Sequence, residues 1–197
     1  MKPIKNFDTI REASDGFEVL PVGGYVCKIL ECVEKENKSG RGSHLEISFD
    51  ICEGDYREWF AQDYRGQGGK DPYWRGVIRQ NIHNEDSDKY EMQCRFFKRF
   101  VSAVENSNPM YTWNWDEESL KGKQIGVVFG EVERESARGI RYMVTQPDSV
   151  CKVEAVRDGS YRTPKPRMLY NPAPAAAPGS LSQGLSELSG NDSDLPF

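Results

Sequence analysis

Aromatic rings and cations alternate in the stretch YRGQGGKDPYWR, residues 64–75. A protein that holds single-stranded nucleic acid without sequence preference needs ring faces on which bases stack and cations that neutralise phosphates. This stretch supplies both on one short segment, and Trp59 stands a few residues before it. From type and spacing, we expect the following side chains to contact such a strand: Trp59, Tyr64, Arg65, Lys70, Tyr73, Trp74 and Arg75.

Two polar turns add further cations. The turn ENKSGRGS carries Lys38 and Arg41, and the turn RESARG with the residues after it carries Arg138 and Arg141. Phosphate contacts from loops of this kind would flank the aromatic segment. For Arg138, and for Arg134 beside it, side chains that merely solvate a hairpin turn are an equally open interpretation.

The chain is acidic as a whole, with a formal net charge of −5, so a uniformly basic binding surface is excluded. The charge is unevenly placed, because residues 168–197 contain three acids and no Lys or Arg. A basic groove can therefore still form on the preceding part. A hydrophobic content of 37% and a mean hydropathy of −0.71 indicate that part of the chain stays outside a packed core.

The cysteines form no Cys-x-x-Cys pair and lie inside apolar patterns, which predicts buried free thiols in a reducing cytoplasm. With only two histidines to add, we expect neither a zinc site nor another metal or cofactor. The chain has no apolar run of bilayer length, so we expect no membrane association. The cysteines are Cys27, Cys32, Cys52, Cys94 and Cys151.

Signals for catalysis are weak. GQGGKD lacks the spacing of a phosphate-binding loop, and no Gly-x-Ser-x-Gly motif occurs. The acids Asp50, Glu53, Asp55 and Glu58 cluster near a turn, where they could hold Mg²⁺ for a nuclease. A solvated turn explains them more simply, so we expect a protein that is not an enzyme and keep the metal-dependent nuclease as the least favoured alternative.

Hydrophobic periodicity predicts three strands, one helix and two more strands. This order is that of an OB-fold, a five-stranded Greek-key barrel with one helix between strands 3 and 4. A generic α+β sandwich would give a similar order. The expected strands are 25–33, 44–51, 57–64, 123–133 and 140–146, the helix runs from about residue 90 to the NSNP sequence at 106–109, and residues 76–90 remain unassigned.

Composition divides the chain into three parts. We expect a lead-in at residues 1–20, the OB-fold domain at residues 21–167, and a disordered linker with an acidic tip at residues 168–197. The linker composition, rich in Pro, Ala, Gly and Ser, begins at about Thr163.

Two stretches resemble known families. The ending DSDLPF, which follows the Pro-rich NPAPAAAPGS, resembles the C-terminal end of bacterial single-stranded DNA-binding proteins. The stretch FFKRFVSAVENSNPMYTWNWDEESLKGKQIGVVFGEVE resembles a family of phage and prophage proteins regarded as OB-fold single-stranded DNA-binding proteins.

The resemblance implies a phage or prophage protein that coats single-stranded DNA in replication or recombination, within the cytoplasm of a bacterial host. It also implies that the tip recruits replication or recombination proteins through Asp192, Asp194, Leu195, Pro196 and Phe197. A protein-interaction adaptor on an OB barrel that does not bind DNA is the alternative, and homo-oligomer formation stays open.

Overall fold

The computed structural model describes residues 3, 19–38, 40, 42–82 and 87–169. Most of the lead-in, Arg41 and the tip at residues 192–197 therefore lie outside the described residues. Among the helices that are described, none is long and apolar enough to cross a membrane.

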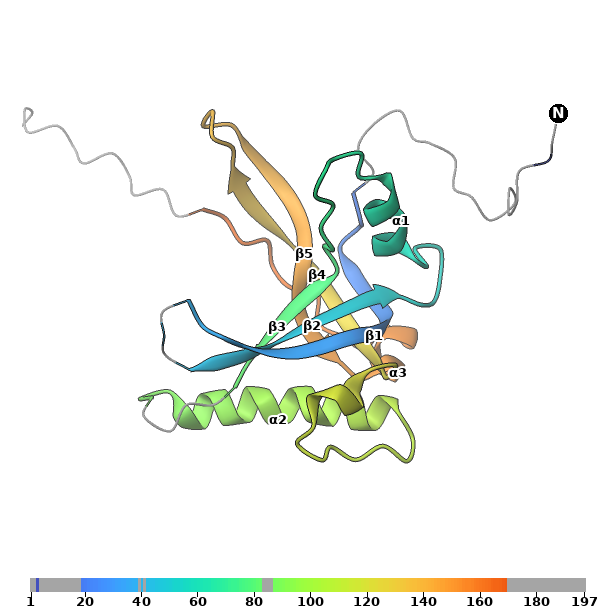
Figure 1. The fold of residues 1–197 in the computed structure, drawn as a ribbon, viewed down its shortest axis with the longest axis vertical. Coiled ribbons are helices and arrows are strands. Elements are labelled where there is room, and N and C mark those ends of the chain that lie inside the picture. The colour runs from blue at the N-terminus through green and yellow to red at the C-terminus, as the bar shows by residue number, and fades with distance from the viewer. Residues whose placement is uncertain (1–2, 4–18, 39, 41, 83–86, 170–197) are drawn as a thin grey trace, which may run out of the picture.

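Five antiparallel strands form one sheet in the order β3-β2-β1-β4-β5 (Figure 1). The predicted mostly β class is confirmed. The sheet is open, because β3 and β5 are its two edges, although these edge strands approach each other in space. The bounds are β1 Gly23–Glu36, β2 Ser43–Ile51, β3 Val77–Asn81, β4 Gln124–Glu135 and β5 Arg141–Cys151.

The helix α2, Tyr90–Ser107, connects β3 to β4 and lies along one side of the sheet, as the periodicity predicts (Figure 1). Its buried side chains are Phe97, Phe100, Ala103 and Val104, whereas Met92 and Phe96 are exposed. The helix stops before Asn108, whose backbone is extended ahead of Pro109.

A single side chain joins the end of α2 to the start of β4. The Asn108 amide donates to the carbonyls of Val104 and Gln124 at 2.7 and 2.8 Å, and its oxygen accepts from the Gln124 N–H at 2.9 Å. The carbonyl of Val104 would otherwise lack a helical partner. The register of α2 against the sheet is thereby set at one point.

The prediction of a third strand at residues 57–64 is wrong. Residues Trp59–Gly66 form the helix α1, and the third strand is β3, within the stretch left unassigned. The reason is a long-range cap: the Asp50 carboxylate, at the end of β2, accepts from the N–H groups of Phe60 and Ala61 at 3.0 and 3.1 Å. These donors would otherwise be unsatisfied in the first turn of α1.

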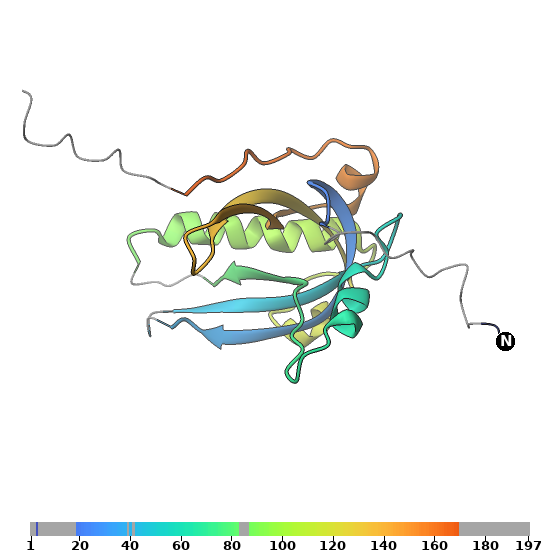
Figure 2. The ribbon, with the colours of Figure 1, turned by 90° about the horizontal axis from the view of Figure 1, so that it is seen from above.

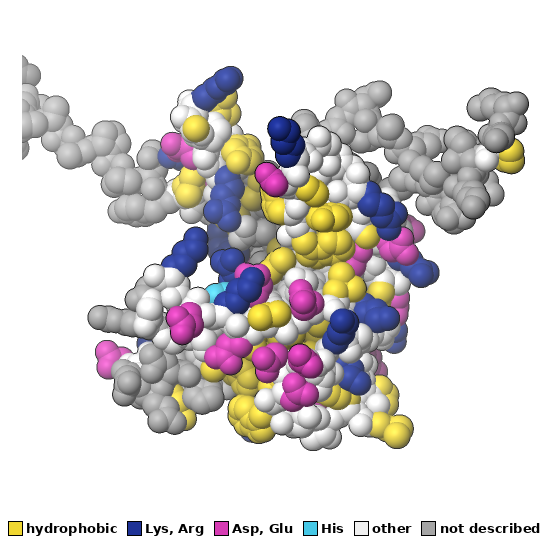
Figure 3. Space-filling model, in the orientation of Figure 1, with side chains coloured by type: hydrophobic (Ala, Val, Ile, Leu, Met, Phe, Trp, Pro, Cys, Tyr) yellow, Lys and Arg dark blue, Asp and Glu magenta, His cyan; other side chains and the backbone are white. Residues whose placement is uncertain are grey.

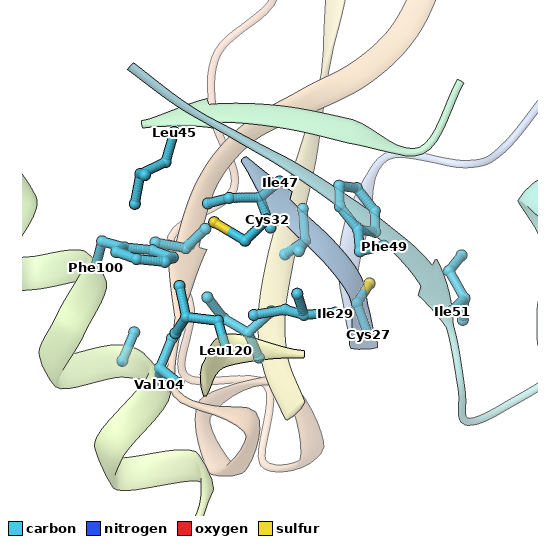
Figure 4. Close-up of a cluster of buried hydrophobic side chains, with 14 of the residues drawn as sticks. Cys27, Ile29, Cys32, Leu45, Ile47, Phe49, Ile51, Phe100, Val104 and Leu120 are labelled. Atoms are coloured by element: carbon cyan, nitrogen blue, oxygen red, sulfur yellow. The ribbon is translucent and has the colours of Figure 1, made fainter. Parts of the chain in front are cut away.

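The core lies between the concave side of the sheet and α2 (Figure 4). Strand β2 contributes the alternating set that its sequence predicts, and β1, α2 and the 3₁₀ turn η2, Glu117–Leu120, contribute the rest. The five described cysteines are free thiols, of which Cys27 and Cys32 are buried and the other three half-buried. Burial raises the pKa of Cys32 to about 12. The β2 residues are Leu45, Ile47, Phe49 and Ile51.

Strand β4 is buried on both sides. Its inner residues join the core, while its outer side is covered by the short helix α3, Val153–Arg157, and by residues 160–169, which we call the strap (Figure 2). Arg167 of the strap donates its N–H to Glu131 and accepts from the N–H of Glu133, at 2.9 and 2.8 Å. The linker expected to begin at Thr163 is thus docked on β4 as far as the structure describes it.

Glycines make room for this outer layer. A Cβ on Gly24 would lie 2.7 Å from the Tyr161 ring, one on Gly126 would meet Val156 at 2.7 Å, and one on Gly130 would meet Pro164 at 2.6 Å. Because these distances are shorter than van der Waals contact, the strap can lie close to β1 and β4 only over residues without a side chain.

The buried Gly76, immediately before β3, gives a test of the fold. A Cβ there would lie 2.3 Å from the Phe49 carbonyl oxygen and 2.7 Å from the Phe60 ring. The backbone cannot move aside as a flexible side chain can. Gly76→Ala should therefore lower the free energy of unfolding, measured by urea denaturation, by about 1–3 kcal/mol. The control is Gly68→Ala, where a Cβ meets open space. Equal stability of the two variants would contradict this account of the α1–β3 connection.

Candidate nucleic-acid interface

Helix α1 and the loop at residues 67–76 carry most of the predicted contact residues, and two of the rings are structural. The Trp74 indole N–H donates to the carbonyls of Phe49 and Gly76, both at 3.1 Å. Its ring packs on Phe60 and Tyr64, with centroids 6.5 and 5.8 Å apart. Trp74 therefore fastens the loop to β2 rather than standing free for a base.

Trp59 is half-buried and packs edge-on against Tyr56, with ring centroids 5.6 Å apart. Of its neighbour Phe60, only 6% is exposed, so Phe60 is the residue of this pair that enters the core. A helix rather than the expected strand therefore positions these two rings.

Tyr73 is the ring best presented to solvent in this segment, with 61% of its surface exposed. The Arg75 guanidinium lies over the ring, 5.1 Å from its centroid. Gln67 holds the tyrosine backbone on both sides, accepting from its N–H at 2.9 Å and donating to its carbonyl at 3.0 Å. Tyr64 adds a second partly exposed ring. The loop thus presents an aromatic face with a cation on a fixed backbone.

Two of the predicted arginines are already paired. Arg75 donates to Asp63 at 3.0 Å, and Arg65 lies 3.7 Å from Glu58. Both arginines are at least half exposed, and ion pairs of this kind contribute about 0–1 kcal/mol. Exchange of a carboxylate for a phosphate is therefore inexpensive. Lys38 and Lys70 are exposed and make no ion pair within the described part of the chain.

The hairpin of β4 and β5 separates its cations onto two sides. Partners across the strands point the same way, so Arg141 shares the inward side of Phe129 with Glu133 and Glu135. It lies 3.9 Å from Glu133 and 3.4 Å from Glu135. Arg138 is exposed in the turn. The inward side of the hairpin is therefore partly acidic, which weakens the case for Arg141 as a phosphate contact.

The outward side of the hairpin holds a ring that sequence reasoning missed. Tyr142 is 49% exposed and lies opposite Arg134, whose guanidinium donates to Gln146 at 2.8 Å. The signal was available once the turn at residues 134–139 was placed, because residues equally distant from a hairpin turn lie across from each other.

The hairpin and the α1 segment stand on the same side of the sheet (Figure 1), and the surface between them is hollowed, with Lys and Arg side chains along it (Figure 3). Acidic side chains gather below this hollow, on the face nearer α2 (Figure 3). Lys38 belongs to the β1–β2 loop, which projects elsewhere. The predicted residues are thus brought together in part.

The acids considered for Mg²⁺ have other roles. Burial raises the pKa of the Asp50 carboxyl, and its hydrogen bonds from Ile51, Phe60 and Ala61 oppose that rise. Glu53 pairs with Arg157, with its two oxygens 2.6 and 3.2 Å from the guanidinium, and this hydrogen bonding lowers its pKa. Among the described residues, no group of three His, Cys, Asp or Glu is placed to hold a metal ion.

The two tryptophans after α2 have different environments. Trp113 packs against the core, but Trp115 is 73% exposed and stacks parallel on Phe97, with centroids 6.1 Å apart. With Tyr90, Cys94 and Val101 they line an apolar groove of about 330 Å³ on α2. This groove lies on a different element from the α1 segment and shares no residue with it.

Sequence reasoning also missed a cationic cleft beneath the strap, lined by Arg99, Arg162 and Lys165. Arg99 of α2 also donates to the Val150 carbonyl at 3.4 Å. The signal was the basic run YRTPKPR at residues 161–167, which a linker composition obscured.

No family model and no curated protein matches the chain, so function has to be argued from this geometry.

The cap on α1 supplies a test of how the interface is positioned. Asp50→Ala leaves two backbone donors of α1 without their acceptor, so the free energy of unfolding should fall by about 1–3 kcal/mol. Urea unfolding measures it, with Asp71→Ala, an exposed loop acid, as the control. Proteolysis at residues 64–75 should also become faster in the first variant alone; equal rates would show that Asp50 does not hold the segment.

Proposed function

We propose that this chain binds single-stranded DNA without chemical transformation of it. The observation that carries the proposal is the α1–β3 segment, which presents Tyr73 beneath Arg75 beside the exposed Lys70. Ring faces and cations on one rigid segment are what sequence-independent binding of a single strand requires. Oligo-dT is the appropriate probe, because it lacks base pairing.

The strand order supports an OB-type barrel as the scaffold. In that fold the strands pair in the order 3-2-1-4-5, the barrel closes between strands 3 and 5, and a helix connects strands 3 and 4. The chain has this order, places α2 at this connection and brings β3 and β5 close together. Our proposal is a barrel that is incompletely closed by hydrogen bonds.

We further propose the biological setting that the sequence resemblance implies, a phage or prophage protein that coats single-stranded DNA in replication or recombination. Recruitment of partner proteins would depend on Asp192, Asp194, Leu195, Pro196 and Phe197. An apolar side chain can fill a partner's pocket while neighbouring acids steer it toward a basic rim.

The DNA-binding proposal is tested by equilibrium binding of labelled oligo-dT over a series of salt concentrations. Tyr73→Ala should weaken binding by roughly 1–3 kcal/mol, because base–aromatic stacking contributes that much. Arg75→Ala should reduce the slope of log Kobs against log salt by about 0.7, the value for one phosphate contact on a single strand.

Matched controls are Trp115→Ala, an exposed ring on the α2 side, and Arg95→Ala, an exposed cation of α2. Both should leave binding unchanged. If wild-type protein fails to retain oligo-dT at low salt, the DNA-binding proposal is wrong and the adaptor alternative gains. Loss of the oligonucleotide when Mg²⁺ is added would instead support the nuclease.

The recruitment proposal has a separate test. Phe197→Ala protein and wild-type protein are immobilised, and bound bacterial replication and repair proteins are identified by mass spectrometry. The variant should lose partners while retaining oligo-dT affinity, because the ring supplies the buried contact and the acids mainly steer association. Recovery of the same partners by both proteins would remove the tip from the proposal.

A further inference from the structure

A cleft of about 500 Å³ lies between the strap and the outward side of β4 and β5, next to α2. Figure 2 shows the strap leaving α3 and running alongside these strands. The cleft exists because Tyr161 and Pro164 contact the sheet over Gly24 and Gly130, while the strap between these contacts stands off the strands.

The cleft has a strong positive charge. Arg99 reaches it from α2, and Arg162 and Lys165 reach it from the strap. Asp148 is the acid among the described lining residues, and it is engaged by Arg167 at 3.4 Å. Like charges around one cleft repel one another unless an anion enters.

Two cations of the strap, Arg162 and Lys165, also lack the pairing found at the α1 segment. Within the described residues, neither Arg162 nor Lys165 makes an ion pair or donates a side-chain hydrogen bond. Arg65 and Arg75, in contrast, each lie near a carboxylate. A phosphate that enters the cleft therefore displaces no acid from these two side chains.

Hydroxyl groups complete the donor set. Ser149 of β5, Ser160 and Tyr161 line the same cleft. Arg, Lys, Ser and Tyr side chains are the usual donors to phosphate oxygens in protein–nucleic-acid contacts. We propose that the cleft under the strap binds phosphate groups, those of the DNA backbone when a single strand is bound.

The outward side of the hairpin extends this site. Gly130, over which Pro164 packs, is two residues from Val132 and four from Arg134, all on one side of β4. Tyr142 lies opposite Arg134 on that side. A strand that leaves the cleft along the hairpin meets an exposed ring and a further cation, as continuous binding requires. The DNA source of the phosphate rests on the proposed function, but the phosphate site itself does not.

The test uses a double variant of the cleft, Arg162→Ser combined with Lys165→Ser. Its control is a second double variant, Arg95→Ser combined with Lys121→Ser, which removes the same charge elsewhere. Both control residues are exposed and lie outside the cleft. Thermal melting verifies that each protein is folded. In oligo-dT titrations, the cleft variant should lose affinity and show a salt slope shallower by about 1.4, the value for two phosphate contacts, and the control should not.

Protection of a cysteine from chemical labelling locates the contact by a measurement that does not depend on charge. Cys151 lines the cleft and is half-buried, whereas Cys94 belongs to the α2 groove. Saturating oligo-dT should slow maleimide labelling of Cys151 in wild-type protein and leave the labelling of Cys94 unchanged. Pyrophosphate alone is the second probe, measured by its effect on melting temperature and on Cys151 labelling.

The outcomes separate the two phosphate sources. A shallower salt slope with Cys151 protection by oligo-dT assigns the cleft to nucleic-acid phosphates. Pyrophosphate protection that is lost in the cleft variant, with oligo-dT binding unchanged or undetectable, assigns it to a free phosphate compound. If neither probe protects Cys151 and the cleft variant behaves like the control, the cleft is not a phosphate site. Absence of oligo-dT binding by wild-type protein counts against the proposed function alone.

Discussion

The end of β2 is the point on which the candidate interface depends. Three consecutive residues there hold the segment between β2 and β3 in place through hydrogen bonds. Phe49 accepts from the Trp74 indole and donates its N–H to the Gly76 carbonyl at 2.8 Å. Asp50 caps α1, and Ile51 accepts from the N–H of Glu58 at 2.8 Å. Because each bond is buried or half-buried, loss of one partner leaves a polar group without water.

This junction explains why the segment at residues 64–75 can present side chains precisely although it contains little regular structure. Its loop has few apolar contacts apart from those of Trp74, and its three glycines would leave an isolated peptide of this composition flexible. Anchors at Asp50, Trp74 and Gln67 remove that freedom before any ligand binds. A strand that binds there therefore has less ordering entropy to overcome.

The elements predicted correctly are those whose pattern is local. Residues 44–51 alternate along β2, and residues 90–107 follow the helical period, so burial of one face decides each structure. Residues 57–64 were assigned wrongly because rings on both faces fit either period. The choice depends on Asp50, a residue outside the segment, which supplies the helical cap. The hydrophobic pattern of a single sequence carries no information about such a long-range contact.

The strap was missed for a related reason. Its composition is that of a linker, and its close approach to the sheet depends on the absence of side chains at Gly24 and Gly130, far away in sequence. The described strap pairs with β4 at Arg167. The candidate site could likewise be predicted only in part. The ring and cation types in residues 64–75 could be identified from the sequence. Which rings are exposed could not, since Trp74 and Tyr73 are neighbours with opposite environments.

The proposed binding of a polyanion by an acidic protein requires its charges to be separated, and ion pairing decides which cations remain available. Around the strap, Arg157 is neutralised by Glu53 and Arg167 by Asp148. The first pair links α3 to the loop that follows β2, and the second links the strap to β5, so these two cations have structural roles. Arg162 and Lys165 lie between them and have no such partner among the described residues. Residues 157–167 thus use their first and last cations for docking and leave Arg162 and Lys165 over the cleft, where we have proposed that phosphate binds.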